Sequence, residues 1–217
     1  MMTVMTSDLG LRERKKQRTR QAISDAAIQL FLARGYDAVS VADVAAAAEV
    51  SKPTLFKYFR SKDELILDRI DDHRAEPAQV VRGRSAGESP LDALHRHQLR
   101  LLADRDPVTG ISDRPQVIAF QRLLYNTESL ANALLAYSIE GVELLRDALV
   151  EACGPGPHRV TAGLVANQIL ITTRRLGLDN WAQVAGGRTT EDLYPEAVAA
   201  VNHAYALLRG GVGDYCG

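Results

Sequence analysis

Apolar residues recur along most of the chain at the spacing of three and four that is typical of helices, and no segment alternates convincingly as a strand would. The first helix is predicted up to Gly35, with a buried stripe formed by Ile23, Ala26, Ala27, Leu30 and Phe31. The segment before this stripe, from Arg12 to Arg20, is polar and is expected to project from the core. The pattern therefore predicts an all-α protein.

Capping residues predict three further short helices. Ser40 and Asp43 form a capping box for the second, with Val41, Val44, Ala45 and Ala48 as its apolar positions. Ser51 caps the third, where Pro53 suits the first turn and where we expect the buried side to consist of Leu55, Phe56 and Phe59. Ser61 and Glu64 form the capping box of the fourth.

Later breakers divide the rest into longer helices. Loops are expected at 83–90 and 104–114, a break at Asn126 and Thr127, a firm stop at 154–157, and a connection near Gly186. We therefore expect a flexible N-terminus (1–11), a small helical domain (12–72) with a helix-turn-helix at 40–59, a larger helical domain (73–210) and a tail (211–217).

Only Glu49 and Val50 separate the second and third helices, an arrangement that suits insertion of the third helix into a DNA major groove. The polar side of that helix offers Ser51, Lys52, Thr54, Lys57 and Tyr58. Charge agrees with this reading: residues 1–62 hold eleven basic and six acidic side chains, whereas the remaining residues hold 15 and 21. The basic N-terminal segment is therefore a candidate for phosphate contact.

The chain resembles the DNA-binding domain of the TetR family over residues 16–72. The resemblance is carried by Ala26-Ala27, Leu30-Phe31, Gly35-Tyr36, Val39-Ser40-Val41, Asp43-Val44-Ala45, Val50 to Phe59 and Ser61 to Leu65. It implies a homodimer that binds a palindromic operator in double-stranded DNA. It also implies phosphate contacts by Ser40, Tyr58 and Lys62, and base reading by Lys52, Pro53, Thr54 and Lys57.

Two positions depart from the family pattern. Glu49 and Pro53 stand where the family usually has glycine. If the turn requires a left-handed residue, Glu49 costs about 1–2 kcal/mol there, and its carboxylate lies on a face meant for DNA.

The resemblance further implies that the larger domain binds a small-molecule effector. Its aromatic and polar candidates are His97, Phe120, Tyr125, Tyr137, Arg174 and Trp181, although residues of these kinds more often belong to the ordinary core or surface. Pairing of the last two helices with a second subunit is expected through Leu164, Val165, Ile169, Leu170, Val198, Val201, Ala204, Tyr205 and Leu208. Burial of these residues within one subunit is the alternative.

Other classes of protein are less well supported. We find no apolar run long enough for a membrane span, no secretory signal, no metal-ligand spacing, no cofactor motif and no persuasive catalytic pair. Cys153 and Cys216 follow no paired spacing, so two free thiols are expected. An all-helical enzyme and an interaction module without DNA binding, favoured by Glu49, remain as alternatives. The sequence predicts a cytoplasmic bacterial transcriptional regulator, in the first instance an effector-released repressor, while activation stays open.

Overall fold

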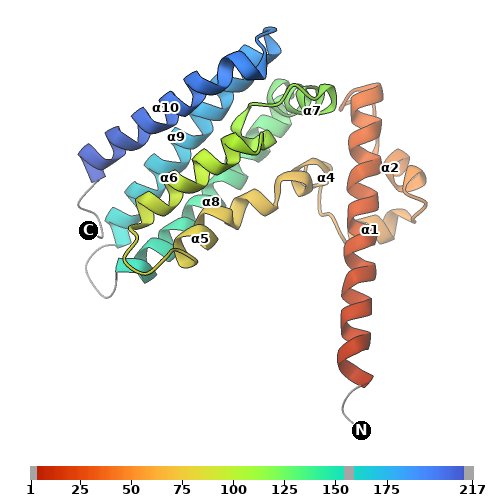
Figure 1. Ribbon diagram of the computed structural model, residues 1–217. Helices are drawn as coiled ribbons and strands as arrows, with labels where there is room; N and C mark the ends of the chain where they lie inside the picture. Colours follow the sequence, from red (N-terminus) through yellow and green to blue (C-terminus); the bar gives the residue numbers. More distant parts are fainter. Residues whose placement is uncertain (1–3, 154–158, 213–217) are drawn as a thin grey trace. The chain divides into compact units, whose positions relative to one another are not determined.

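A computed structural model describes residues 4–153 and 159–212, and its secondary structure in these ranges is helical throughout (Figure 1). The chain divides into two compact units. The first unit comprises residues 1–70 with 122–131, and the second comprises 71–121 with 132–217. The predicted all-α fold class, with an N-terminal helix-turn-helix unit and a larger helical unit, is confirmed.

The first unit is built around a long helix. Its elements are α1 (Val4–Arg34), α2 (Val41–Ala47), α3 (Lys52–Phe56), α4 (Glu64–Leu67) and the 3₁₀ turn η1 (Asp68–Ile70). The α1 residues Ile23, Ala27 and Phe31 are at most 1% exposed, as their spacing predicts. The helix begins at Val4, within the segment 1–11 that we expected to precede the small helical domain.

The second unit is a helical bundle. Its elements are α5 (Asp72–Arg82), α6 (Pro90–Ala103), the 3₁₀ turn η2 (Pro107–Thr109), and the helices α7 (Pro115–Asn126), α8 (Glu128–Cys153), α9 (Arg159–Ala185) and α10 (Thr190–Val212). Helices α7 and α8 each begin or end in the first unit. The breaks predicted at 83–90 and at Thr127 are confirmed, while the one at 154–157 lies outside the described residues.

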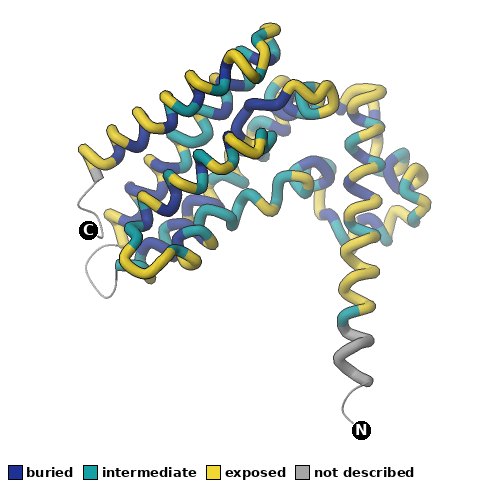
Figure 2. Tube along the Cα trace, in the orientation of Figure 1, coloured by how far each residue is buried: buried dark blue, intermediate teal, exposed yellow. Residues whose placement is uncertain are grey.

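Buried residues of α5, α6, α8, α9 and α10 form the main core of this bundle, including Leu102, Leu145, Ile169 and Leu193 (Figure 2). The loop after α6 is held tightly against α9, because Asn180 donates a buried hydrogen bond of 2.9 Å to the carbonyl of Thr109. This loop is therefore a packed part of the core.

The expected subunit-pairing residues need correction. Val165, Ile169, Val201, Tyr205 and Leu208 are at most 8% exposed, because they pack within their own subunit. Of the named positions, Leu164 alone is among the large exposed apolar residues, at 59%. It shares one face of α9 with Val160 and Ile171, which are 76% and 65% exposed, since these positions are four and seven residues from it.

The described residues bear on two other expectations. Cys153 is disulfide-bonded, so the prediction of a free thiol there was wrong; Cys216 lies outside the described residues. Within residues 4–153 and 159–212, no helix combines the length and the apolar character that a membrane crossing demands.

Candidate nucleic-acid interface

Capping interactions fix the start of both short helices. The Ser40 hydroxyl accepts a hydrogen bond from the Asp43 amide at 3.1 Å, and the Asp43 carboxylate accepts one from the Ser40 amide at 2.8 Å. The Ser40 hydroxyl also donates to the Asp43 carboxylate at 2.6 Å, and this hydrogen bond, together with that from the Ser40 amide, holds the pKa of Asp43 below its usual value. At α3, the Ser51 hydroxyl accepts from the Thr54 amide at 3.2 Å, and Pro53 lies in the first turn. Both predicted caps are confirmed.

Glu49 closes α2 in a left-handed conformation, with φ of 53°. Its amide donates to the Ala46 carbonyl, and the Val50 amide donates to the Ala45 carbonyl at 2.9 Å. These two bonds form a Schellman motif, which normally places glycine at the position of Glu49. The turn of the helix-turn-helix therefore has the shape that a glycine would give, at the cost of local strain.

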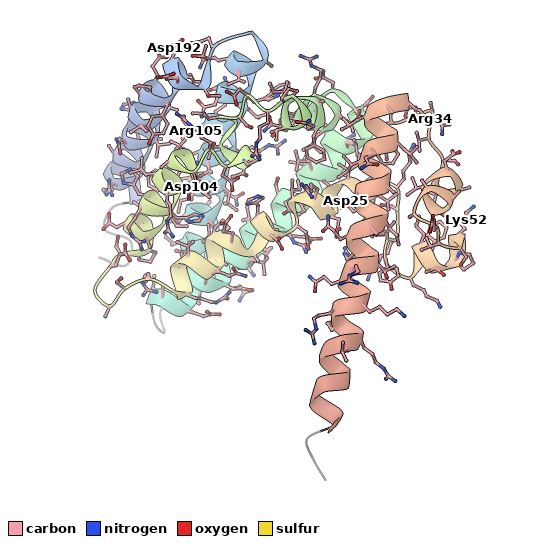
Figure 3. All side chains as sticks on the ribbon, turned by 45° about the vertical axis from the view of Figure 1, so that its right-hand side comes forward. Asp25, Arg34, Lys52, Asp104, Arg105 and Asp192 are labelled. Atoms are coloured by element: carbon pink, nitrogen blue, oxygen red, sulfur yellow. The ribbon has the colours of Figure 1, made fainter. Side chains whose placement is uncertain are left out.

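Helix α3 has a sharply divided surface. Leu55 and Phe59 are 1% and 0% exposed and attach the helix to the unit. The exposed side consists of Lys52, Pro53, Phe56 and Lys57, and we call these four residues the α3 face. Lys52 and the helix that carries it are visible in Figure 3.

The prediction that Phe56 is buried was wrong. Phe56 is 46% exposed, because Leu55 of α3 and Phe59, just after the helix, already fill the inward side of this segment. It lies four residues from Lys52 and so on the same side. An exposed phenyl ring can make apolar contact with a thymine methyl group, which makes Phe56 a functional candidate that the sequence reading missed.

Arg20 links α1 to the residues that follow α3. Its guanidinium donates to the Tyr58 carbonyl at 2.9 Å and to the Asp68 carboxylate at 2.5 Å, and it lies 4.6 Å from the centre of the Phe59 ring. We expected Arg20 to project from the core with the rest of its segment, and that was wrong. Its position three residues before the buried Ile23 was the available signal, because it continues the inward stripe.

The residues expected to contact phosphate lie around the same helices. Ser40 is exposed at the start of α2, and Tyr58 is half-buried just after α3. Lys62 is also half-buried; its ammonium donates to the Tyr36 carbonyl and lies 3.9 Å from the centre of the Tyr36 ring. Since an ammonium has three donor hydrogens, this arrangement leaves donors for a further partner.

The six residues expected at an effector site are spread over both units. Tyr125 belongs to the first unit, whereas the other five belong to the second. Among these five, Arg174 of α9 lies 3.5 Å from the Ser138 hydroxyl of α8, and Arg74 stacks on the Tyr137 ring. Burial raises the pKa of Tyr137. His97 is nearly buried and approaches Glu76, while Phe120 and Trp181 are half-buried on α7 and α9.

A cavity of about 770 Å³ lies between α5 and α8 of the second unit. It is lined chiefly by charged side chains: Asp71, Asp72, His73, Arg74, Glu76, Glu140, Glu143 and Asp147. None of the six expected effector residues lines this cavity in the part of the chain that the structure describes. The structure thus offers an acidic cavity for a small molecule, distinct from the residues expected from the sequence.

Comparison with known proteins identifies the N-terminal helices. The family model "Bacterial regulatory proteins, tetR family" matches residues 23–68, which contain α2, α3 and α4. The HTH-type transcriptional regulator TcmR of Streptomyces glaucescens is 41% identical over 85 residues, 39% of this chain and 38% of TcmR. The HTH-type transcriptional repressor Rv3405c of Mycobacterium tuberculosis is 33% identical over 102 residues, 43% of this chain and 51% of the repressor. The chain therefore spans about two fifths to one half of these relatives.

The likeness in fold extends further. NalD of Pseudomonas aeruginosa, the secondary repressor of the MexAB-OprM multidrug efflux pump, aligns over 88% of this chain and 96% of its own with a TM-score of 0.58 at 20% identity. Salmonella enterica GusR aligns over 89% and 94% with a TM-score of 0.53 at 20% identity. The match identifies residues 23–68 as a helix-turn-helix segment of the TetR family of bacterial regulatory proteins, and the likeness to NalD and GusR is one of fold.

Proposed function

We propose that the protein is a DNA-binding transcriptional regulator that reads its operator with the α3 face. The observation that carries this proposal is the exposure of Lys52, Pro53, Phe56 and Lys57 on a helix whose other side is fully buried. Support comes from relatives in two organisms that are named transcriptional regulator and transcriptional repressor. No catalytic role is proposed, since TetR-family regulators are not enzymes.

In this proposal, the α3 face enters the major groove and the surrounding residues hold the backbone. Lys52 and Lys57 donate to guanine acceptors, Thr54 lies between them, and Phe56 contacts a thymine methyl. Ser40, Ser51, Tyr58 and the remaining donors of Lys62 contact phosphates, which fixes the register of α3 along the duplex.

The protein acts as a homodimer on a palindromic site, because two α3 helices must reach major grooves about 34–36 Å apart. The exposed face of α9, formed by Val160, Leu164 and Ile171, is the surface that supports pairing. Helix α10 runs beside α9 in Figure 1 and adds the exposed Leu207. Covering these side chains in a four-helix interface would remove a large apolar area from water.

A small molecule regulates DNA binding by preferring a dimer conformation with the wrong spacing. The cavity between α5 and α8 has a volume within the range of ligand pockets. Six of its lining residues are carboxylates against the single arginine Arg74. This imbalance supports a cationic effector over an anionic one.

The proposal is tested by fluorescence anisotropy with DNA from upstream of the protein's own gene. Replacing Lys57→Ala should weaken binding by about 1–3 kcal/mol, roughly 5- to 150-fold, and relax base preference at one operator position. Arg100→Ala, which removes an exposed charge from α6, is the matched control and should bind as wild type. Equal affinity of all three proteins, or failure of the wild type to bind DNA, would contradict the proposal.

A further inference from the structure

The N-terminal part of α1 is a highly charged helical segment that lies outside the helix-turn-helix. Residues 11–18 are all exposed, and residues 12–18 carry five basic side chains against the single acidic Glu13. In Figures 1 and 3 this part of the helix continues past α2 and past Lys52, clear of the other elements of its unit. We call residues 11–18 the basic arm.

Among the residues whose side chains the structure describes, the arm makes hydrogen bonds and ion pairs only with its own helix. Arg20, two residues beyond it, is engaged with Tyr58 and Asp68. Within the arm, the Arg14 side chain bonds the carbonyl of Gly10 on its own helix, and Lys16 lies 3.8 Å from Glu13. Both interactions are local, so neither attaches the arm to the rest of the unit.

The arrangement of the charges is unfavourable for an isolated helix. Arg12 and Lys16, like Arg14 and Arg18, are four residues apart, and such like-charge neighbours repel each other. Since successive residues turn by about 100° around the helix axis, basic side chains point to every side of the arm. A neighbouring polyanion would attract these basic side chains and so offset the repulsion between them.

We propose that the basic arm is a second DNA-contacting surface, which binds phosphates beside the base pairs that the α3 face reads. The inference rests on the proposed function, because the partner is the same duplex. Residues 12–18 span about 10 Å of helix, enough to reach roughly three base pairs of backbone. A bilayer surface fits less well, because the arm has no apolar face to insert and Leu11 is its one apolar side chain.

Phosphate contacts of this kind raise affinity without selecting sequence, and they have a measurable signature. Each one adds about 0.9 to the slope of log affinity against log salt concentration. The arm should therefore contribute to binding of any duplex, and to the same extent on operator and mixed-sequence DNA.

The test compares the full-length protein with the variant Arg14→Gln, Lys15→Gln, Lys16→Gln and Arg18→Gln. Glutamine preserves helix propensity, and these side chains support no packing, so circular dichroism and thermal melting should match the wild type. Arg20 is left intact because it stabilises the unit. The matched control removes four exposed arginines of the second unit: Arg96→Gln, Arg100→Gln, Arg159→Gln and Arg175→Gln.

Binding is followed by anisotropy on a labelled mixed-sequence duplex of about 40 base pairs and on the upstream DNA, from about 50 to about 300 mM KCl. We expect the arm variant to lose about 2 or more units of salt slope per subunit on both duplexes, while the control keeps the wild-type slope. An unchanged slope in the arm variant, or an equal loss in the control, overturns the proposal although DNA binding stands. If the arm variant instead loses binding to phosphatidylglycerol vesicles with its DNA slope intact, the arm is a membrane contact and the proposal is wrong. A wild type that binds neither duplex refutes the proposed function as well.

Discussion

The guanidinium of Arg20 donates a hydrogen bond of 2.9 Å to the backbone carbonyl of Tyr58, 38 residues later in the chain. This bond joins α1 to the residue that follows α3. The same guanidinium pairs with Asp68, whose side chain is only 10% exposed, so the carboxylate of this ion pair is largely shielded from water. The orientation of the α3 face is thus fixed by a residue outside the helix-turn-helix.

Arg20→Ala should therefore destabilise the first unit and weaken DNA binding together. The loss is about 2 kcal/mol, because the Asp68 carboxylate is left without this partner while Arg20 itself is partly solvated. Arg69→Ala is the matched control: it breaks the exposed Arg69–Asp25 pair of the same two elements, 3.6 Å apart, and should cost under about 0.5 kcal/mol. Urea unfolding checks both values. Equal losses of unfolding free energy in the two variants would contradict a stabilising role of the Arg20 contacts beyond that of an exposed ion pair.

We expect Glu49 to lower stability through its backbone conformation and to weaken DNA binding through its charge. Glu49→Gly should relieve its left-handed strain and stabilise the protein by up to about 1 kcal/mol, after the greater flexibility of glycine in the unfolded chain is subtracted. Glu49→Gln keeps the strain but removes the charge. Both variants should bind DNA more tightly than wild type at low salt, and Glu49→Gly alone should raise the melting temperature. A gain in stability from Glu49→Gln would contradict the assignment of the strain to the backbone.

The stability of the second unit should depend on pH through His73 and Glu76. The hydrogen bond of 2.8 Å between them raises the pKa of His73 and lowers that of Glu76 to about 2. His97 also lowers the pKa of Glu76, although its Nε2 atom, 3.3 Å from the Glu76 carboxylate, lies outside hydrogen-bond geometry. The Glu76 contribution is complete above the ordinary pKa of 4.5 and is lost as the pH falls toward 2. The His73 contribution is complete below 6.5 and is lost as the pH rises through the folded-state pKa.

The two windows overlap between pH 4.5 and 6.5, where the interaction is at full strength. In that range Glu76→Gln should reduce the free energy of unfolding by about 2 kcal/mol, and less at higher pH. Urea titrations of wild type and variant at several pH values measure the difference. A difference that does not vary between pH 5 and about 8 would contradict this account.

Gly110 should tolerate no side chain. Its φ is 75°, and a Cβ atom added there would lie 2.0 Å from the Gly177 carbonyl oxygen of α9. Gly110→Ala should therefore cost more than about 2 kcal/mol, because both the backbone and the neighbour must shift. Gly210→Ala, in an open exposed position of α10, should be neutral or stabilising by up to about 1 kcal/mol. Comparable melting temperatures for the two variants would be inconsistent with the close packing of this loop.

The caps and the apolar spacing made much of the first unit predictable from sequence. Ser40 and Ser51 act locally, within three residues, so the helices that they begin could be read directly. Phe56 could not, because its exposure depends on how Leu55 of α3 and Phe59, three residues past its end, share the inward side of this segment. The role of Arg20 depends on partners 38 and 48 residues away, which no local pattern reveals.

In the second unit, periodicity identified the helices but not the direction that each apolar stripe faces. Tyr205 and Leu208 follow the same spacing as a subunit contact would, yet they pack inside the subunit. Leu164 lies one position before Val165, about 100° around α9, and points outward. Only the positions of neighbouring helices distinguish these cases, and a single sequence does not contain them.

Hydroxyl-radical footprinting of the full-length protein on the upstream DNA tests the central claim most directly. If paired α3 faces read a palindrome, the two strands should show protected patches related by twofold symmetry, their centres about 10 base pairs or a multiple apart. Lys57→Ala should raise, by the same factor for both patches, the protein concentration needed for protection. A single asymmetric patch, or full protection by Lys57→Ala at the wild-type concentration, would contradict the account.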